Sequence, residues 1–173
     1  EGSLSINGAL DNSSGAITAD NDIFMYARAY SSDLNSTLRA GHNIDMTVTG
    51  TFQNAGTIAA GQDLALNIGS NGWNNYAGPV TNSGNITAKG HLAIQMNSSA
   101  LENSVTLTAD QMDLQLSDLN NSGSIASKND INLNLNNLNN LRSGDIKSDR
   151  NITINASAVT TEAGSQIQAG GDT

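Results

Sequence analysis

The sequence contains no cysteine, a single proline and few aromatic residues, which make up 3% of the chain. Without cysteine there are neither disulfides nor thiolate metal sites, although this does not exclude an extracellular location. Hydrophobic residues amount to 37%, which is poor material for the core of an ordinary compact domain. The apolar residues are nevertheless periodic and mostly aliphatic, which argues against a disordered chain.

Basic residues are also scarce, with seven Lys and Arg against 16 Asp and Glu and a net charge of −9. Nucleic-acid binding needs a basic footprint, so no nucleic-acid partner is expected. No apolar run is long enough to predict a membrane-spanning segment, and no signal peptide starts at Glu1. Because both ends fall inside a repeat, we expect residues 1–173 to be a single segment excised from a longer repeat protein.

The chain does contain a repeat with a period near 20 residues, which indicates a stack of similar structural units. The similarity between units is visible in two segments, Asn82-Ser-Gly-Asn-Ile-Thr-Ala-Lys and Asn121-Ser-Gly-Ser-Ile-Ala-Ser-Lys. Each unit has one aliphatic anchor, and the anchors are Ile17, Leu38, Ile58, Ile86, Leu107, Ile125, Ile146 and Ile167.

Each repeat predicts enough short strand segments to form one complete coil. Residues six, eight and ten positions after an anchor are apolar, as in Ile44, Met46 and Val48, and this alternation predicts a strand with one buried face. A further apolar residue lies six positions before most anchors, and a small residue lies two positions after them. We therefore predict an all-β fold, a parallel β-helix (solenoid) of about eight coils of about 20–21 residues. Asparagines at equivalent bends are expected to form amide ladders.

One step between anchors, from Ile58 to Ile86, is 28 residues long. The excess predicts an extra-helical loop at residues 69–79, whose tip has the composition of a recognition element. The candidate partner-binding residues of this tip are Trp73, Asn74, Asn75 and Tyr76. The alternative is that the loop covers Phe24 and Tyr26, which alternate with inward residues and should point outward.

Two other irregular segments interrupt the period. The chain from Ala27 to Asp33 joins two coils irregularly, and Arg28 and Tyr30 are expected there to extend the outward patch of Phe24 and Tyr26. The segment Asn97–Met112 is one residue short and predicts a bulge in the stack.

The sequence offers little for catalysis. His42 and His91 lie two coils apart, about 10 Å, too far to share one zinc ion. Acidic pairs such as Asp110 and Asp113 occupy positions where acidic residues are common in the repeat. We therefore expect no catalytic residues, no metal site, no cofactor and no enzymatic activity. The alternative is a polysaccharide-binding or polysaccharide-cleaving β-helix protein, like a tailspike or a lyase.

The segment Phe52–Ile68, Phe-Gln-Asn-Ala-Gly-Thr-Ile-Ala-Ala-Gly-Gln-Asp-Leu-Ala-Leu-Asn-Ile, resembles the haemagglutinin repeat of two-partner-secreted bacterial exoproteins. The resemblance implies a right-handed β-helix, an outer-membrane transporter as secretion partner, and an extracellular filament at the bacterial surface. That family includes filamentous haemagglutinin adhesins and contact-dependent growth-inhibition proteins, which deliver toxins, and the motif does not separate the two. The implied function is a non-enzymatic stalk that contacts neighbouring coils and a receptor on a bacterial or host cell.

Overall fold

The computed structural model describes residues 2–69, 79–96 and 99–171, and all regular structure in these ranges is β. In chain order the strands are β1 (Leu4–Asn12), β2 (Ala16–Ala19), β3 (Ile23–Ser32), β4 (Thr37–Ala40), β5 (Ile44–Val48), β6 (Phe52–Asn54), β7 (Thr57–Ala60), β8 (Leu64–Ile68), β9 (Val80–Asn82), β10 (Asn85–Ala88), β11 (His91–Met96), β12 (Ala100–Asn103), β13 (Thr106–Ala109), β14 (Gln111–Gln115), β15 (Asp118–Asn121), β16 (Ser124–Ser127), β17 (Ile131–Asn140), β18 (Asp145–Ser148), β19 (Ile152–Thr161) and β20 (Gln166–Ala169).

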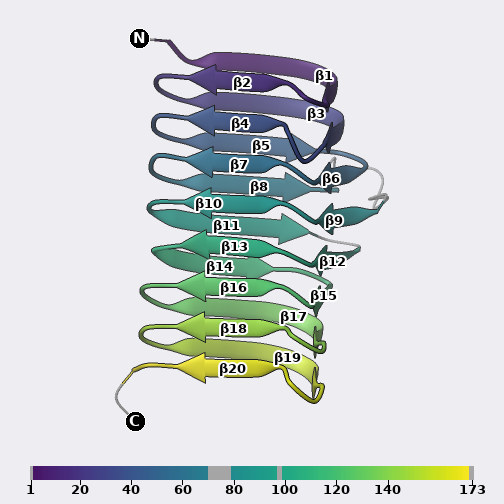
Figure 1. Cartoon of the computed structure of the whole chain (residues 1–173), viewed down its shortest axis with the longest axis vertical. Coiled ribbons are helices and arrows are strands. Elements are labelled where there is room, and N and C mark those ends of the chain that lie inside the picture. The colour runs from purple at the N-terminus through teal and green to yellow at the C-terminus, as the bar shows by residue number, and fades with distance from the viewer. Residues whose placement is uncertain (1, 70–78, 97–98, 172–173) are drawn as a thin grey trace.

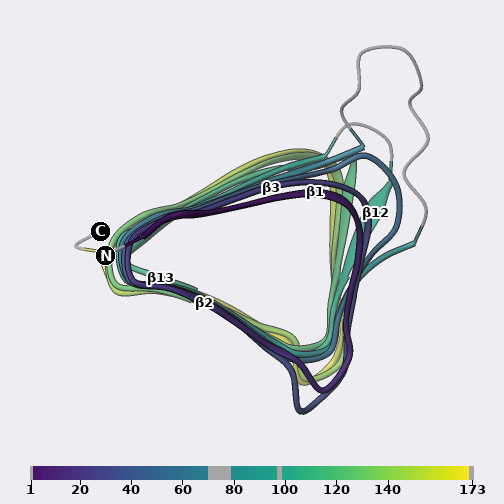
Figure 2. The same cartoon turned by 90° about the horizontal axis from the view of Figure 1, so that it is seen from above.

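The strands wind into a rod of triangular cross-section (Figures 1 and 2). We call the three sides the first, second and third faces in the order in which each coil visits them. The third face is an eight-stranded sheet in the order β2-β4-β7-β10-β13-β16-β18-β20. A 12-stranded sheet forms the other two faces, because β1, β3, β17 and β19 continue round the corner between them. The pairings are parallel, so the predicted β-solenoid is confirmed.

The predicted register of the repeat is also confirmed. Each anchor pairs with the anchor of the next coil, from Ile17 with Leu38 to Ile146 with Ile167. The six internal anchors are at most 1% exposed. The first face has an equivalent column that runs from Ile23 through Ile44 and Leu64 to later coils. The core is therefore a set of aliphatic stacks parallel to the rod axis.

The residue two positions after each anchor is small because the corner beyond the third face is narrow. Alanines hold this position in the first five coils, and Ser127 and Ser148 replace them later without becoming exposed. Both serine hydroxyls donate hydrogen bonds to backbone carbonyls, that of Ser127 to Asp110 at 2.8 Å and that of Ser148 to Asn129. The adjoining turn is equally tight, since a Cβ on Gly61 would lie 1.8 Å from the Gly41 carbonyl oxygen.

The predicted amide ladder runs inside the corner between the second and third faces. Its five asparagines are at most 1% exposed and are Asn54, Asn82, Asn103, Asn121 and Asn140. Each side-chain amide donates to the side-chain oxygen of the next asparagine at 2.8–2.9 Å. The last one, Asn140, donates to the backbone carbonyl of Gln166 at 2.8 Å. Because these buried polar groups are hydrogen-bonded, they fix the register at little cost in desolvation.

The irregular join between the first coils places Tyr30 inside the rod, so its predicted position in the outward patch is wrong. The register shifts between Gly8 and Leu10, which pair with Ala27 and Tyr30 of β3. The extra residue in β3 changes the alternation, and Tyr30 turns inward at 1% exposure. Its ring stacks on Phe52 with centroids 5.3 Å apart and an interplanar angle of 21°.

In the described part of the segment 97–112, the strand pairing shows no bulge, so the predicted bulge is not found there. Met112 pairs with Leu92 in unbroken register. The turn between β13 and β14 is one residue shorter than the equivalent turns. In this turn, the backbone N–H groups of Asp110 and Gln111 both donate to the Gly90 carbonyl. Residues 97 and 98 of this segment lie outside the described residues. A turn absorbs the deletion because its length is less constrained than a paired strand.

Candidate functional site

Two aromatic side chains point outward from β3 on the first face. Phe24 is 50% exposed and Tyr26 is 49% exposed, while Ile23 and Met25, which alternate with them along the strand, are buried. This follows from the two-residue alternation of a strand whose other face packs on the core. In the described part of the chain, the other large hydrophobic residues that are exposed are Leu34, beyond the end of β3, and Val159 on β19. Phe24 and Tyr26 thus form the one aromatic pair on the described surface.

The neighbouring strands place polar side chains beside this pair. Phe24 pairs with Ser5 of β1 and Asp45 of β5, and Tyr26 pairs with Asn7 and Thr47 in the same way. These residues line a shallow depression of about 200 Å³ together with Ile6 and Met25. We call the six outward residues Ser5, Asn7, Phe24, Tyr26, Asp45 and Thr47 the aromatic depression. It combines an apolar floor with hydrogen-bonding groups on both sides.

The other candidate contact residues have different outcomes. Arg28 is exposed on the same strand, as predicted, and Tyr30 is inside the rod. The predicted loop tip of Trp73, Asn74, Asn75 and Tyr76 lies outside the described residues, as does most of the 69–79 segment. Neither role predicted for this loop, partner contact or cover, is therefore tested by the structure.

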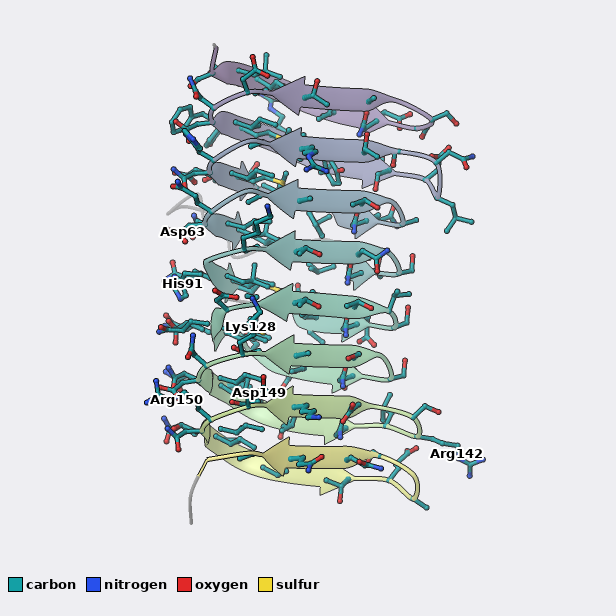
Figure 3. The ribbon with its side chains drawn as sticks, turned by 60° about the vertical axis from the view of Figure 1, so that its left-hand side comes forward. Asp63, His91, Lys128, Arg142, Asp149 and Arg150 are labelled. Atoms are coloured by element: carbon teal, nitrogen blue, oxygen red, sulfur yellow. The ribbon has the colours of Figure 1, made fainter. Side chains whose placement is uncertain are left out.

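The corner between the third and first faces has a ladder of polar side chains in which Asp alternates with Asn or His, and Figure 3 labels two of its members, Asp63 and His91. Asn43 donates from its backbone and side-chain nitrogens to Asp22 Oδ1, each at 3.0 Å. Asp63 N donates to Asn43 Oδ1 at 3.2 Å, and His91 N donates to Asp63 Oδ1 at 2.8 Å. The alternation avoids stacked carboxylates, which would repel each other by about 1 kcal/mol in water.

A second column at this corner alternates in charge. Three residues after successive anchors come Lys89, Asp110, Lys128 and Asp149. Lys128 Nζ lies 2.7 Å from Asp110 Oδ1, and that hydrogen bond and charge, with a smaller effect of Asp149, raise the pKa of Lys128. We did not predict this column, although its signal is present in the sequence at a fixed distance from the anchors.

Asp113, on the first face near this corner, also bonds to neighbouring coils. Asp113 Oδ2 lies 2.6 Å from His91 Nε2, and Asp113 Oδ1 accepts from Asn132 Nδ2 at 2.7 Å. Asp110 and Asp113 therefore bind different partners and do not converge as an acid–base pair. Within the described ranges, no three His, Cys, Asp or Glu side chains are grouped so that they could hold a metal ion. The ionisable groups seen here connect coils to one another.

Two carboxylates hold the turn that follows the second face. Asp33 accepts from the backbone and side chain of Ser14, at 2.9 and 2.8 Å, and these bonds lower the pKa of Asp33. Asp11 accepts from the hydroxyls of Ser13 and Ser31, which lowers its pKa too. A carboxyl whose pKa is lower in the folded state stabilises the fold above its unfolded pKa.

We predict that the rod loses stability as the pH falls below about 4 and that Asp33→Asn flattens this dependence. The stabilisation from Asp33 is complete above its unfolded pKa and disappears as the pH drops through its lower folded pKa. Melting temperatures measured by circular dichroism between pH 7 and pH 2.5 test this, with Asp118→Asn on the second face as control. An Asp33→Asn profile identical to that of the parent protein would contradict the assignment.

The haemagglutinin-repeat family model matches residues 1–110, 68–134 and 100–173, which together cover the chain. The chain therefore belongs to the haemagglutinin-repeat family. Comparisons with curated proteins and with solved structures gave no match. Among the residues that the structure describes, no helix is long and apolar enough to cross a membrane.

Proposed function

We propose that this chain is a non-enzymatic segment of an exported surface filament, which acts as a stalk and as a contact surface for a target cell. Membership of the haemagglutinin-repeat family supports the filament role. The regular register of the coils supports it as well, since each coil adds length in one direction without changing the cross-section. At about 4.8 Å per coil, eight coils extend about 38 Å along the axis.

The stalk's mechanism is geometric. Each coil hydrogen-bonds to the next through parallel strands and through the buried asparagine ladder, so the rod resists bending between coils. A stiff rod holds whatever it carries at a fixed distance from the cell surface. Export through an outer-membrane transporter partner fits this design, because coils can fold one after another onto a growing stack. A filamentous haemagglutinin adhesin and a contact-dependent growth-inhibition protein both use such a stalk, and we propose a parent protein of this group.

The observation that carries the contact role is the aromatic pair of Phe24 and Tyr26. Two half-exposed aromatic side chains on one strand face, with small and polar residues on the neighbouring strands, favour a binding site. Arg28 extends this surface along the same strand. We include the loop residues Trp73, Asn74, Asn75 and Tyr76 in the proposal on the basis of their composition.

The contact role predicts that Phe24→Thr with Tyr26→Thr reduces binding to target cells by at least about tenfold, a loss typical of removing central aromatic contacts. Threonine keeps the strand propensity and removes the rings. The measurement is the retention of fluorescent beads coated with the protein on cells that the parent chain binds. Val159→Thr, which changes a similarly exposed side chain elsewhere, should bind as the parent does.

A second variant, Trp73→Thr with Tyr76→Thr, distinguishes binding through the loop from binding through Phe24 and Tyr26 on β3. If the loop variant alone loses binding, the contact lies in the loop and not on β3. If both aromatic variants bind normally while their circular dichroism is unchanged, the contact role is wrong and the chain acts only as a stalk.

A further inference from the structure

The aromatic depression is built on a stiff part of the rod. Residues two apart on a strand lie about 6.6 Å from each other on the same side, so the two rings form a short platform. The strand that carries them is paired on both sides, with β1 and with β5. Ile23 and Met25, whose side chains alternate with the rings, are at most 3% exposed and fix the strand against the core. The platform therefore exists before a ligand arrives.

The rim of the depression is polar and adaptable. Ser5, Asn7 and Thr47 each offer both a donor and an acceptor, and Asp45 offers a carboxylate that accepts. These groups stand on both sides of the rings, because β1 supplies two of them and β5 supplies the other two. A purely apolar ligand would leave these polar groups without partners and would therefore bind poorly.

The charge of the depression further restricts the class of ligand that it can bind. None of its lining residues is Lys, Arg or His, and the one charged group is Asp45. The whole chain carries a net charge of −9. The one basic residue of β3, Arg28, lies outside the lining, so an anionic ligand such as a sulfated or sialylated glycan would meet repulsion from Asp45 and from the net negative charge. The size of about 200 Å³ suits one ring of a small ligand more than an extended protein surface.

We propose that the aromatic depression binds a pyranose ring of a neutral glycan. The apolar C–H side of the sugar packs on Phe24 and Tyr26, and its hydroxyl groups hydrogen-bond to Asn7, Asp45 and Thr47. Sugars match this site because they present an apolar face and a ring of donors and acceptors at once. The inference rests on the proposed contact role and specifies its ligand class.

The test uses the whole 173-residue chain and saturation-transfer NMR with defined probes. The probes are the methyl pyranosides of glucose, galactose, mannose and N-acetylglucosamine, their uncharged oligosaccharides, and sulfated and sialylated counterparts. We expect at least one neutral probe to receive saturation, strongest at the protons of one ring face. Phe24→Thr and Tyr26→Thr should each reduce the signal at least fivefold, and Asp45→Asn should weaken binding by a smaller factor. Val159→Thr should leave the signal unchanged.

Three results would overturn the glycan assignment. The first is no saturation of any neutral probe, the second is stronger binding of the sulfated or sialylated probes, and the third is a signal that survives both threonine substitutions. The folding of each variant is checked by its melting temperature. If the ring variants lose cell binding although no glycan binds, the contact role stands and the ligand is a protein. If cell binding and glycan binding are both unaffected, the two proposals fail together.

Discussion

Ile125→Asp is expected to lower the free energy of unfolding by about 5 kcal/mol, which is enough to unfold much of the protein. Ile125 is fully buried and stacks between Leu107 and Ile146 of the adjacent coils. The substitution removes an aliphatic side chain from this stack, which alone costs about 2–3 kcal/mol. It also buries a carboxylate without a cationic partner. Urea denaturation followed by circular dichroism measures the loss.

The matched control is Ala126→Asp, one residue further along β16. Ala126 points outward and pairs with Thr108 on one side and Lys147 on the other, so an aspartate there gains a cation nearby. We expect a change within about 0.5 kcal/mol. Ser124→Asp is also expected to be far milder than Ile125→Asp, but Asp145 pairs with Ser124 and adds repulsion. Equal losses for Ile125→Asp and Ala126→Asp would contradict the assignment of inward and outward faces.

Asn103→Leu is expected to lower the free energy of unfolding by about 3 kcal/mol, although leucine is more apolar and similar in size. Asn103 accepts from Asn82 and donates to Asn121, each at 2.8 Å, inside a corner closed to water. Leucine leaves the Asn121 oxygen without its donor and leaves the Nδ2 group of Asn82 with only a 3.4 Å contact to the Thr106 carbonyl, while Asn82 Oδ1 still accepts from Asn54. Each buried polar group without a partner costs about 1–3 kcal/mol.

The control for the ladder is Asn137→Leu on the second face. Asn137 is exposed and donates to Asp118 Oδ1 at 2.5 Å at the surface, where water can replace that bond. We expect a change below about 0.5 kcal/mol in the same urea denaturation. If the two substitutions are equally harmful, the buried ladder is not what fixes the corner. If Asn103→Leu stabilises the rod, the asparagines are retained for a reason other than stability.

Most of the fold could be predicted because every coil of the solenoid has the same pattern of inward and outward residues. A parallel stack places equivalent residues of successive coils in contact, so an aliphatic residue such as Leu107 predicts its neighbours from spacing alone. The alternation around each anchor then divides inward from outward positions. Small inward residues and the glycines at the bends follow from the narrow corners. Spacing and alternation are enough for this prediction, and the handedness of the coils is not needed.

Simple strand alternation predicts the wrong side of β3 for Tyr30 because the join between the first two coils is irregular. The extra residue in β3 turns it inward, where it fills the column that Phe52 continues in the next coil. A sequence signal was available, since Ser32 occupies the position six residues before Leu38 where most coils have an apolar residue. The core of this coil needed another large side chain, and Tyr30 supplies it.

The polar columns were harder to predict than the apolar ones. An Asn at a bend is compatible with a solvated turn and with a buried ladder, and only the packing of the corner decides between them. The alternation of Lys89, Asp110, Lys128 and Asp149 depends on side chains that reach between coils at the surface. The outward direction of Phe24 and Tyr26 was predictable from alternation, whereas the polar rim around them required the pairing of β1 and β5 with β3.

The most direct test of the account is disulfide formation between cysteines placed at registered positions, in a chain that has no cysteine of its own. Thr108 and Ala126 pair on the third face in adjacent coils and point outward. Their Cα atoms should lie about 4.8 Å apart, within the range that a disulfide spans. The account predicts that Thr108→Cys with Ala126→Cys is oxidised readily, whereas Thr106→Cys with Ala126→Cys, displaced by two residues, is not. Preferential oxidation of the displaced pair would contradict the stacked register from which the inward core and the outward aromatic depression both follow.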